Sequence, residues 1–220
     1  MNQNFSNSSV LFSGISERDM KTLLDCISAK RKSYAKGDFI FSAGDVTESM
    51  GLVLSGAVNI ESVDIWGGRS ILGHVKEGEL FAETYACLKN EPLMVSAVAA
   101  LPSEILFLSA ERVLHACPAS CGFHSKLIEN FIEVMARNNL NLSGRIFHTA
   151  PKTIRGRLVS YLSFLVTEQG KSCVTVPFNR QQLADYLGVD RSAMSNEIGK
   201  MQDDGMISVS KNEFTLHQML

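Results

Sequence analysis

Residues 179–207 have the sequence NRQQLADYLGVDRSAMSNEIGKMQDDGMI, which has the pattern of two short helices joined by a tight turn. Apolar residues recur at helical spacing in both halves, and Gly188 and Val189 lie between them. Asp190 is placed to cap the second helix. A glycine turn, a cap and an apolar face in one register predict a helix-turn-helix.

The outward face of the second predicted helix is polar. It carries Arg191, Ser192, Ser195, Asn196 and Lys200. A helix whose exposed first turns hold Arg, Ser and Asn can enter a major groove and contact base edges. The alternative is a plain helical hairpin packed into a core. The coincidence of turn, cap and polar face favours DNA binding.

The segments around this motif predict a winged helix. They are an amphipathic helix over 154–165, a strand over 174–176, and two strands over 206–209 and 213–216. The last two strands form a hairpin with Lys211 near its tip, where a contact with a phosphate and a solvated turn are equally reasonable. Pro151 marks the boundary, so we assign residues 150–220 to a DNA-binding domain.

The first half of the chain has a different pattern, with one short helix after Ser16 and then short β-type runs separated by glycine turns. The runs are 39–41, 51–54, 57–63, 70–75, 96–100 and 105–108. Strands this short and regular predict a small antiparallel barrel or roll. We therefore predict an α+β fold in which residues 1–117 form a β-roll domain.

Residues 118–149, between the two predicted domains, have the pattern of one long helix. Its seam residues, spaced as in a coiled coil, are Ile128, Ile132, Met135, Asn139, Leu142 and Ile146. A polar seam residue such as Asn139 lowers stability but can fix the register and a two-stranded state. The alternative is a helix that packs only on its own barrel. Its length and its position between two domains favour a dimerisation helix.

The composition is that of an ordinary globular protein, with 45% hydrophobic and 20% charged residues. No apolar run reaches the length of a membrane span, and the N-terminus lacks the layout of a signal peptide. We therefore expect a cytoplasmic protein with no membrane partner.

The net charge is −2, and residues 150–220 hold 8 Lys/Arg against 7 Asp/Glu. DNA binding must then depend on a local patch rather than on an overall positive field.

The five cysteines are an odd number in a chain too large to depend on disulfides, so we expect thiols. Cys117, Cys121 and His124 would share one face of a continuous helix and are candidates for a metal or redox site. Pro118 interrupts that helix, and free cysteines are commonly small buried hydrophobes, so core packing is the alternative. The sequence has no nucleophile elbow, P-loop or HExxH motif, which argues against an enzyme.

A β-roll, a long helix and a C-terminal winged helix-turn-helix, in this order, resemble the Crp/Fnr family of bacterial transcription regulators. The most specific segments are 78–83, 180–184 and 191–195. The resemblance implies a homodimer that binds a palindromic site in double-stranded DNA, with one recognition helix in each major groove. It also makes RNA polymerase a candidate partner.

The resemblance places individual residues in the DNA interface. It assigns base reading to Arg191, Ser192 and Asn196, and it places Arg180, Gln181 and Asp190 near the DNA backbone or the groove edge. Asn196 replaces the arginine that is common at this place in the family. The usual half-site of the family should therefore not be assumed.

The effector site departs from the cyclic-nucleotide-binding relatives, in which a Gly-Glu pair meets the ribose and an Arg-Ser pair holds the cyclic phosphate. Glu83-Thr84 match the first element, but Val95-Ser96-Ala97 stand where Arg should precede Ser-Ala. Lys89 is the only cation between Glu83 and Ala100, so no arginine offers a bidentate phosphate contact. We therefore predict a small-molecule effector other than cyclic AMP.

The N-terminal cysteine cluster of iron–sulfur members is also missing, because only Cys26 precedes residue 87. The cofactor is therefore left open. Two alternative functions remain. One is a redox-sensing or metal-sensing regulator that uses Cys117, Cys121 and His124. The other is a ligand-binding module whose winged helix contacts proteins.

Overall fold

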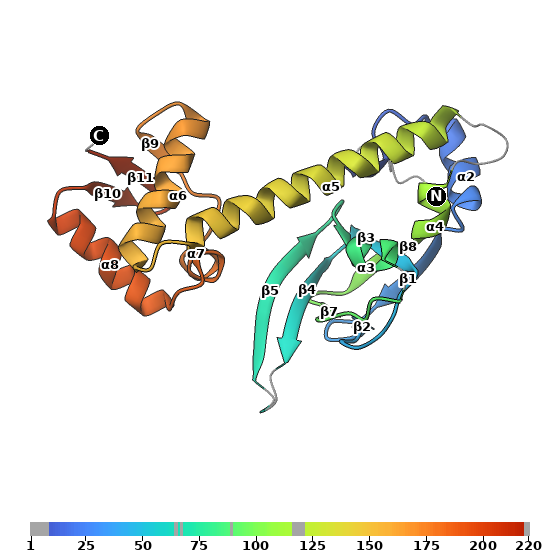
Figure 1. The fold of residues 1–220 in the computed structure, drawn as a ribbon, viewed down its shortest axis with the longest axis horizontal. Helices are drawn as coiled ribbons and strands as arrows, with labels where there is room; N and C mark the ends of the chain where they lie inside the picture. Colours follow the sequence, from blue (N-terminus) through green and yellow to red (C-terminus); the bar gives the residue numbers. More distant parts are fainter. Residues whose placement is uncertain (1–8, 64–65, 67, 89, 116–121, 218–220) are drawn as a thin grey trace. The chain divides into compact units, whose positions relative to one another are not determined.

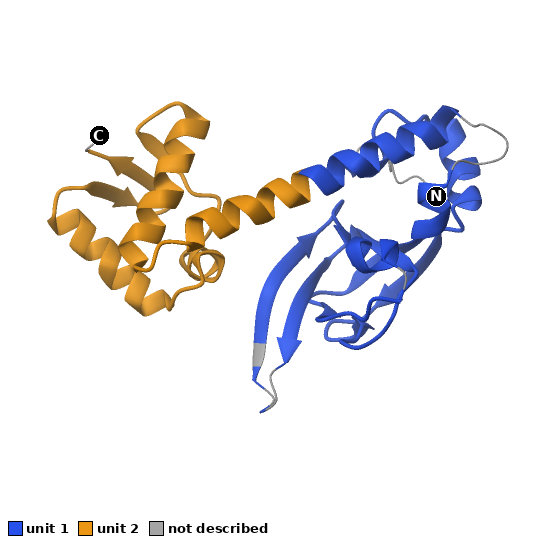
Figure 2. Ribbon diagram, viewed as in Figure 1, with its two compact units in different colours: residues 1–136 blue, residues 137–220 orange. Residues whose placement is uncertain are grey.

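The chain folds into two compact units, residues 1–136 and residues 137–220 (Figure 1, Figure 2). The structure is a computed structural model that describes residues 9–63, 66, 68–88, 90–115 and 122–217. The division between the units falls within the long helix α5 (Gly122–Thr149). Helix α5 therefore contributes residues to both units.

The first unit is an antiparallel β-roll with short helices around it (Figure 1). Its elements before α5 are η1 (Val10–Phe12), α2 (Glu17–Cys26), β1 (Lys30–Tyr34), β2 (Phe39–Phe41), β3 (Ser49–Ser55), β4 (Ala57–Val63), β5 (Arg69–Lys76), β6 (Leu80–Phe81), α3 (Glu83–Cys87), β7 (Ser96–Ala99), β8 (Ser103–Ser109) and α4 (Ala110–Leu114). The strands form two four-stranded sheets, in the orders β1-β8-β3-β6 and β2-β7-β4-β5. All described pairings are antiparallel, which confirms the predicted roll.

Two strands of the roll were not predicted. Strand β1 has the sequence KRKSY, which shows no apolar alternation, and only Tyr34 is buried. It pairs with β8 at the edge of its sheet, where charged side chains protect an exposed edge from pairing with other chains. Strand β6 has only two residues, too few for a periodic pattern.

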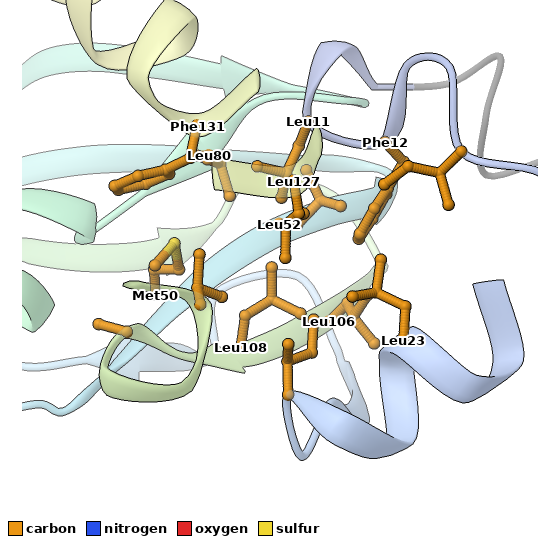
Figure 3. Close-up of a cluster of buried hydrophobic side chains, with 14 of the residues drawn as sticks. Leu11, Phe12, Leu23, Met50, Leu52, Leu80, Leu106, Leu108, Leu127 and Phe131 are labelled. Atoms are coloured by element: carbon orange, nitrogen blue, oxygen red, sulfur yellow. The ribbon is translucent and has the colours of Figure 1, made fainter. Parts of the chain in front are cut away.

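The main core of the first unit lies between its first sheet and the surrounding helices (Figure 3). Leu52 and Leu106 from the sheet pack with Leu23 of α2 and with Leu127 and Phe131 of α5. A fully buried leucine or phenylalanine contributes roughly 1.5–3 kcal/mol relative to an exposed one. The first turns of α5 are therefore an integral part of the roll.

The second unit is a three-helix domain with a small sheet. After the end of α5 it contains α6 (Ile154–Gln169), β9 (Cys173–Thr175), α7 (Arg180–Leu187), α8 (Arg191–Asp203), β10 (Ile207–Ser210) and β11 (Glu213–Leu216). The strands pair antiparallel in the order β10-β11-β9. Leu158, Leu183, Met194, Ile198 and Phe214 are among the buried core residues. The predicted winged helix-turn-helix is confirmed.

The end of α5 belongs to this second unit because His148 is buried in it. The imidazole ring lies 5.4 Å from the ring of Tyr161, 5.1 Å from Phe164 and 6.2 Å from Tyr186, between ring centroids. Its Nδ1 is 3.3 Å from Ser160 Oγ. Burial lowers the pKa of His148, which favours the neutral ring among these aromatic neighbours.

Candidate DNA interface and effector pocket

The helix-turn-helix is defined by three local features. Helix α7 begins with a capping box, in which the Asn179 side chain accepts from the Gln182 N–H at 2.9 Å and the Gln182 side chain accepts from the Asn179 N–H at 3.0 Å. It ends at Leu187 and is followed by the C-cap residue Gly188, whose φ of 63° is in the left-handed region. Asp190 then caps α8, because its carboxylate accepts from the Ala193 N–H at 2.7 Å.

The cap at Asp190 gives a stability prediction. Replacing Asp190 with alanine should lower the free energy of unfolding by about 0.5–2 kcal/mol, because the N–H groups of the first turn lose their acceptor. Urea unfolding of the full chain, followed by circular dichroism, measures this loss. Asp203→Ala is the matched control, since it removes an aspartate carboxylate from the C-terminal end of α8. A negative charge at that end opposes the helix dipole and does not cap the helix. Equal losses in both variants would contradict the capping role.

The predicted base-reading residues lie together on the exposed face of α8. Arg191, Ser192, Ser195, Asn196 and Lys200 are all exposed. The opposite face carries the buried Met194, Ile198 and Met201. The Ser195 hydroxyl donates to the Arg191 carbonyl at 2.9 Å, and Lys200 Nζ lies 3.9 Å from a Glu197 carboxylate oxygen. Arg191 and Asn196 thus combine exposure with side chains suited to base edges.

Two of the three predicted backbone-contacting residues, Arg180 and Gln181, border an open hollow of about 620 Å³ next to α8, whereas Asp190 is not among the residues that line it. Its lining residues are Asn179, Arg180, Gln181, Arg191, Gln202, Val209, Lys211 and Asn212. The Arg180 guanidinium lies over the Phe214 ring at 4.9 Å from its centroid, and burial lowers the pKa of Arg180. The Gln181 amide donates to Asp185 at 2.9 Å. Arg180, Arg191 and Lys211 therefore supply a local positive patch in a chain with little net charge.

An ion-pair network that was not predicted joins α6 to α8 and to its C-cap residue Asp204. Arg155 Nε lies 2.6 Å from Glu197, and Arg155 Nη1 lies 2.7 Å from Asp204. These two carboxylates raise the pKa of Arg155. No sequence pattern reports such a pairing, since Arg155 and Glu197 are 42 residues apart.

The β-roll contains a pocket of about 240 Å³ where the effector was expected. Its lining residues are Ile60, Val75, Leu80, Phe81, Ala82, Glu83, Thr84, Tyr85, Leu93, Val95, Ser96 and Ala97. The structure thus brings all five predicted effector residues, Glu83, Thr84, Val95, Ser96 and Ala97, to one pocket. Most of the lining is apolar, and none of the described lining residues is Lys or Arg. The Ser96 hydroxyl already accepts from the Ala43 N–H at 3.0 Å.

The predicted dimer seam is only partly covered. Ile132, Leu142 and Ile146 are 60%, 62% and 69% exposed. Met135 packs against the core of the first unit, and Ile128 is half-buried. Asn139 is exposed, and its side-chain oxygen accepts from the Ser143 hydroxyl at 3.4 Å. The seam therefore leaves a row of apolar side chains in contact with solvent.

The predicted metal or redox set cannot be assembled from the structure, because Cys117 and Cys121 lie outside the described residues. His124 is buried, and its Nε2 lies 3.3 Å from the Val113 carbonyl oxygen. Within the described ranges, no three His, Cys, Asp or Glu side chains are grouped so that they could hold a metal ion. The same part of the chain holds no helix with the length and apolar character needed to cross a membrane.

An antiparallel roll with an apolar pocket, combined with a winged helix-turn-helix, defines a class of transcription regulators with an effector-binding domain. Residues 31–119 match the model of the cyclic nucleotide-binding domain, and residues 156–219 match the Crp-like helix-turn-helix domain. The chain belongs to the Crp/Fnr family of transcription regulators.

Individual relatives agree with this assignment at low identity. The chain is 24% identical over 200 residues to the global nitrogen regulator of Nostoc sp., covering 85% of each chain. It is 25% identical over 199 residues to the cyclic AMP receptor protein of Thermus thermophilus, covering 90% of this chain and 88% of the relative. The c-di-GMP responsive global regulator CLP of Xanthomonas campestris has a similar structure, with a TM-score of 0.60 at 19% identity, covering 93% of this chain and all of CLP.

Proposed function

We propose that this protein is a homodimeric, sequence-specific DNA-binding transcription regulator whose DNA affinity depends on a small molecule bound in the β-roll. The observation that carries the proposal is the exposed polar face of α8 beside the hollow bordered by Arg180, Arg191 and Lys211. Arg191, Ser192 and Asn196 contact base edges, and the cations of the hollow contact phosphates. The protein acts in the cytoplasm, with RNA polymerase as a candidate partner.

The homodimer is supported by the exposed part of the seam. Ile132, Leu142 and Ile146 would be covered by the same residues of a second α5, as a two-fold interface requires. Asn139 would then lie between the two helices and fix their register. Two recognition helices related by a two-fold axis match a palindromic operator, with half-sites about one helical turn apart.

The effector is proposed to be a small, largely apolar molecule without a phosphate group. Most of the described residues that line the pocket are apolar, and none of them is a lysine or arginine that could neutralise a phosphate. A ligand that prefers the DNA-competent arrangement raises DNA affinity, and DNA then raises the affinity for the ligand by the same factor.

The DNA-binding proposal is tested by selecting duplexes from a random library with the full-length protein and then titrating the selected duplex by fluorescence anisotropy. The logarithm of the affinity should fall linearly with the logarithm of the salt concentration, because phosphate contacts release counterions. Failure to enrich any sequence, together with salt-independent binding to protein partners, would favour the ligand-binding module whose winged helix contacts proteins.

Cyclic AMP is expected to leave the protein unchanged. A ligand at 100 times its Kd stabilises the folded state by about 2.7 kcal/mol, which raises Tm by several degrees. We expect no rise in Tm with cyclic AMP at about 1 mM, because the part of the pocket that the structure describes has no lysine or arginine to pair with the cyclic phosphate. The cyclic AMP receptor protein of Thermus thermophilus is the positive control. A clear rise in Tm would contradict the proposed effector class.

A further inference from the structure

Two arginines outside the predicted DNA interface contact the C-terminal end of α7. Arg145 of α5 donates from Nε to the Tyr186 carbonyl at 3.1 Å and from Nη2 to the Asp185 carbonyl at 3.0 Å. Arg157 of α6 donates from Nη1 to the carbonyls of Leu187 and Gly188, both at 2.9 Å. Four consecutive carbonyls at the helix-turn-helix turn thus accept from two guanidinium groups.

These contacts complete the hydrogen bonding of a helix end. An α-helix leaves its last four carbonyl groups without partners inside the helix. The Val189 N–H donates to the Ala184 carbonyl at 3.0 Å, and the arginines supply donors for the carbonyls that follow. A cation at a helix C-terminus is also favoured by the helix dipole. The positively charged donors make these hydrogen bonds stronger than those between neutral groups.

Both arginines are fixed by further contacts within the second unit. Arg157 Nε donates to the Pro151 carbonyl at 2.9 Å, so this guanidinium joins the segment after α5 to the turn. The Arg145 guanidinium also lies over the Tyr186 ring, 6.0 Å from its centroid. The last turns of α5 are therefore attached to α7 by charge-assisted hydrogen bonds as well as by the aromatic packing of His148.

We propose that Arg145 and Arg157 are positioning residues for DNA reading, an inference that rests on the proposed function. Their four carbonyl partners directly precede Val189 and Asp190, the cap of α8, so they determine where the recognition helix begins. Arg145 lies on α5 between the exposed seam residues Leu142 and Ile146. A shift of this part of the seam would therefore displace the donors that contact the turn. Through Arg145, the geometry of the dimer helix sets the placement of α8.

The test compares full-length Arg145→Met and Arg157→Met with the wild type on the selected duplex and on a random duplex at equal salt. Each variant should lose about tenfold or more in specific affinity, while its random-duplex affinity stays within about twofold. Hydrogen exchange should become faster in residues 188–195, and the dimer mass should stay unchanged. Arg145→Lys should recover part of the specific affinity, since an ammonium group can still donate to one carbonyl.

Lys171→Met is the matched control, because it removes one positive charge from an exposed loop of the same unit. It should leave both affinities and the exchange rates unchanged. Specific affinities within twofold of the wild type for both arginine variants would overturn the inference, and so would equal losses on both duplexes. If the wild type selects no duplex, the proposed DNA-binding function is wrong, whatever the role of the two arginines. Hydrogen exchange then tests the positioning role by itself, and unchanged exchange rates in residues 188–195 would refute that role.

Discussion

Replacing Arg191 with alanine is expected to weaken binding to the selected duplex by about 1–3 kcal/mol, roughly fivefold to 150-fold, and to relax one base preference. Arg191 is the first residue of α8 and is exposed. A guanidinium in this position can donate to O6 and N7 of one guanine, and a bidentate contact of this kind carries most of the discrimination at that base pair. Alanine retains the helix but removes both donors.

Repeating the duplex selection with the Arg191→Ala protein measures the lost preference, and anisotropy titration measures the lost affinity. Lys211→Ala is the comparison, because Lys211 lies at the wing turn and borders the same hollow. A phosphate contact carries no sequence information, so this variant should weaken binding to all duplexes alike and reduce the salt slope by about 1. If Arg191→Ala also loses the same amount of affinity for specific and random duplexes, then Arg191 does not read a base.

The parts of the fold that could be predicted from the sequence are those defined by local chemistry. The turn at Gly188, the cap at Asp190 and the apolar face of α8 all lie within a few residues of one another, and all three are confirmed. Strand β1 could not be predicted because its sequence KRKSY has no apolar alternation, and it is recognised as a strand only by its pairing with β8. The local signals are therefore reliable for the recognition helix and absent for β1 and the two-residue strand β6.

The contacts that orient the recognition helix could not be predicted, because each joins residues far apart in the sequence. Arg145 lies about 40 residues before its carbonyl partners, and Arg155 lies 42 residues before Glu197. A sequence pattern also does not show which backbone carbonyls accept hydrogen bonds from distant side chains. The effector pocket is an intermediate case. Five of its lining residues followed from the resemblance, namely Glu83, Thr84, Val95, Ser96 and Ala97. Ile60 and Val75 were not predicted, because they lie in strands whose sequences show only an apolar pattern.

The seam residues of α5 differ in their surroundings. From sequence alone, Met135 and Leu142 are equivalent positions for introducing a charge. In the structure Met135 packs against the core of the first unit, so a charge there would destabilise the roll as well as any interface. Leu142 and Ile146 are mostly exposed, so a charge at either position is tolerated in a single chain.

Leu142→Glu and Ile146→Glu are therefore expected to convert the dimer to monomers, because a two-fold interface would bury two unpaired carboxylates against each other. Loss of the second recognition helix should then weaken binding to a palindromic duplex by about 100-fold or more, since linked sites gain 10²–10⁴ in avidity. Asn141→Glu is the matched control, as it adds the same charge at an exposed position on the opposite face of α5. Sedimentation equilibrium gives the mass, and anisotropy gives the affinity. A wild-type mass and wild-type affinity in both seam variants would show that α5 does not form the interface, and the signal from the β-roll would need another route to α8.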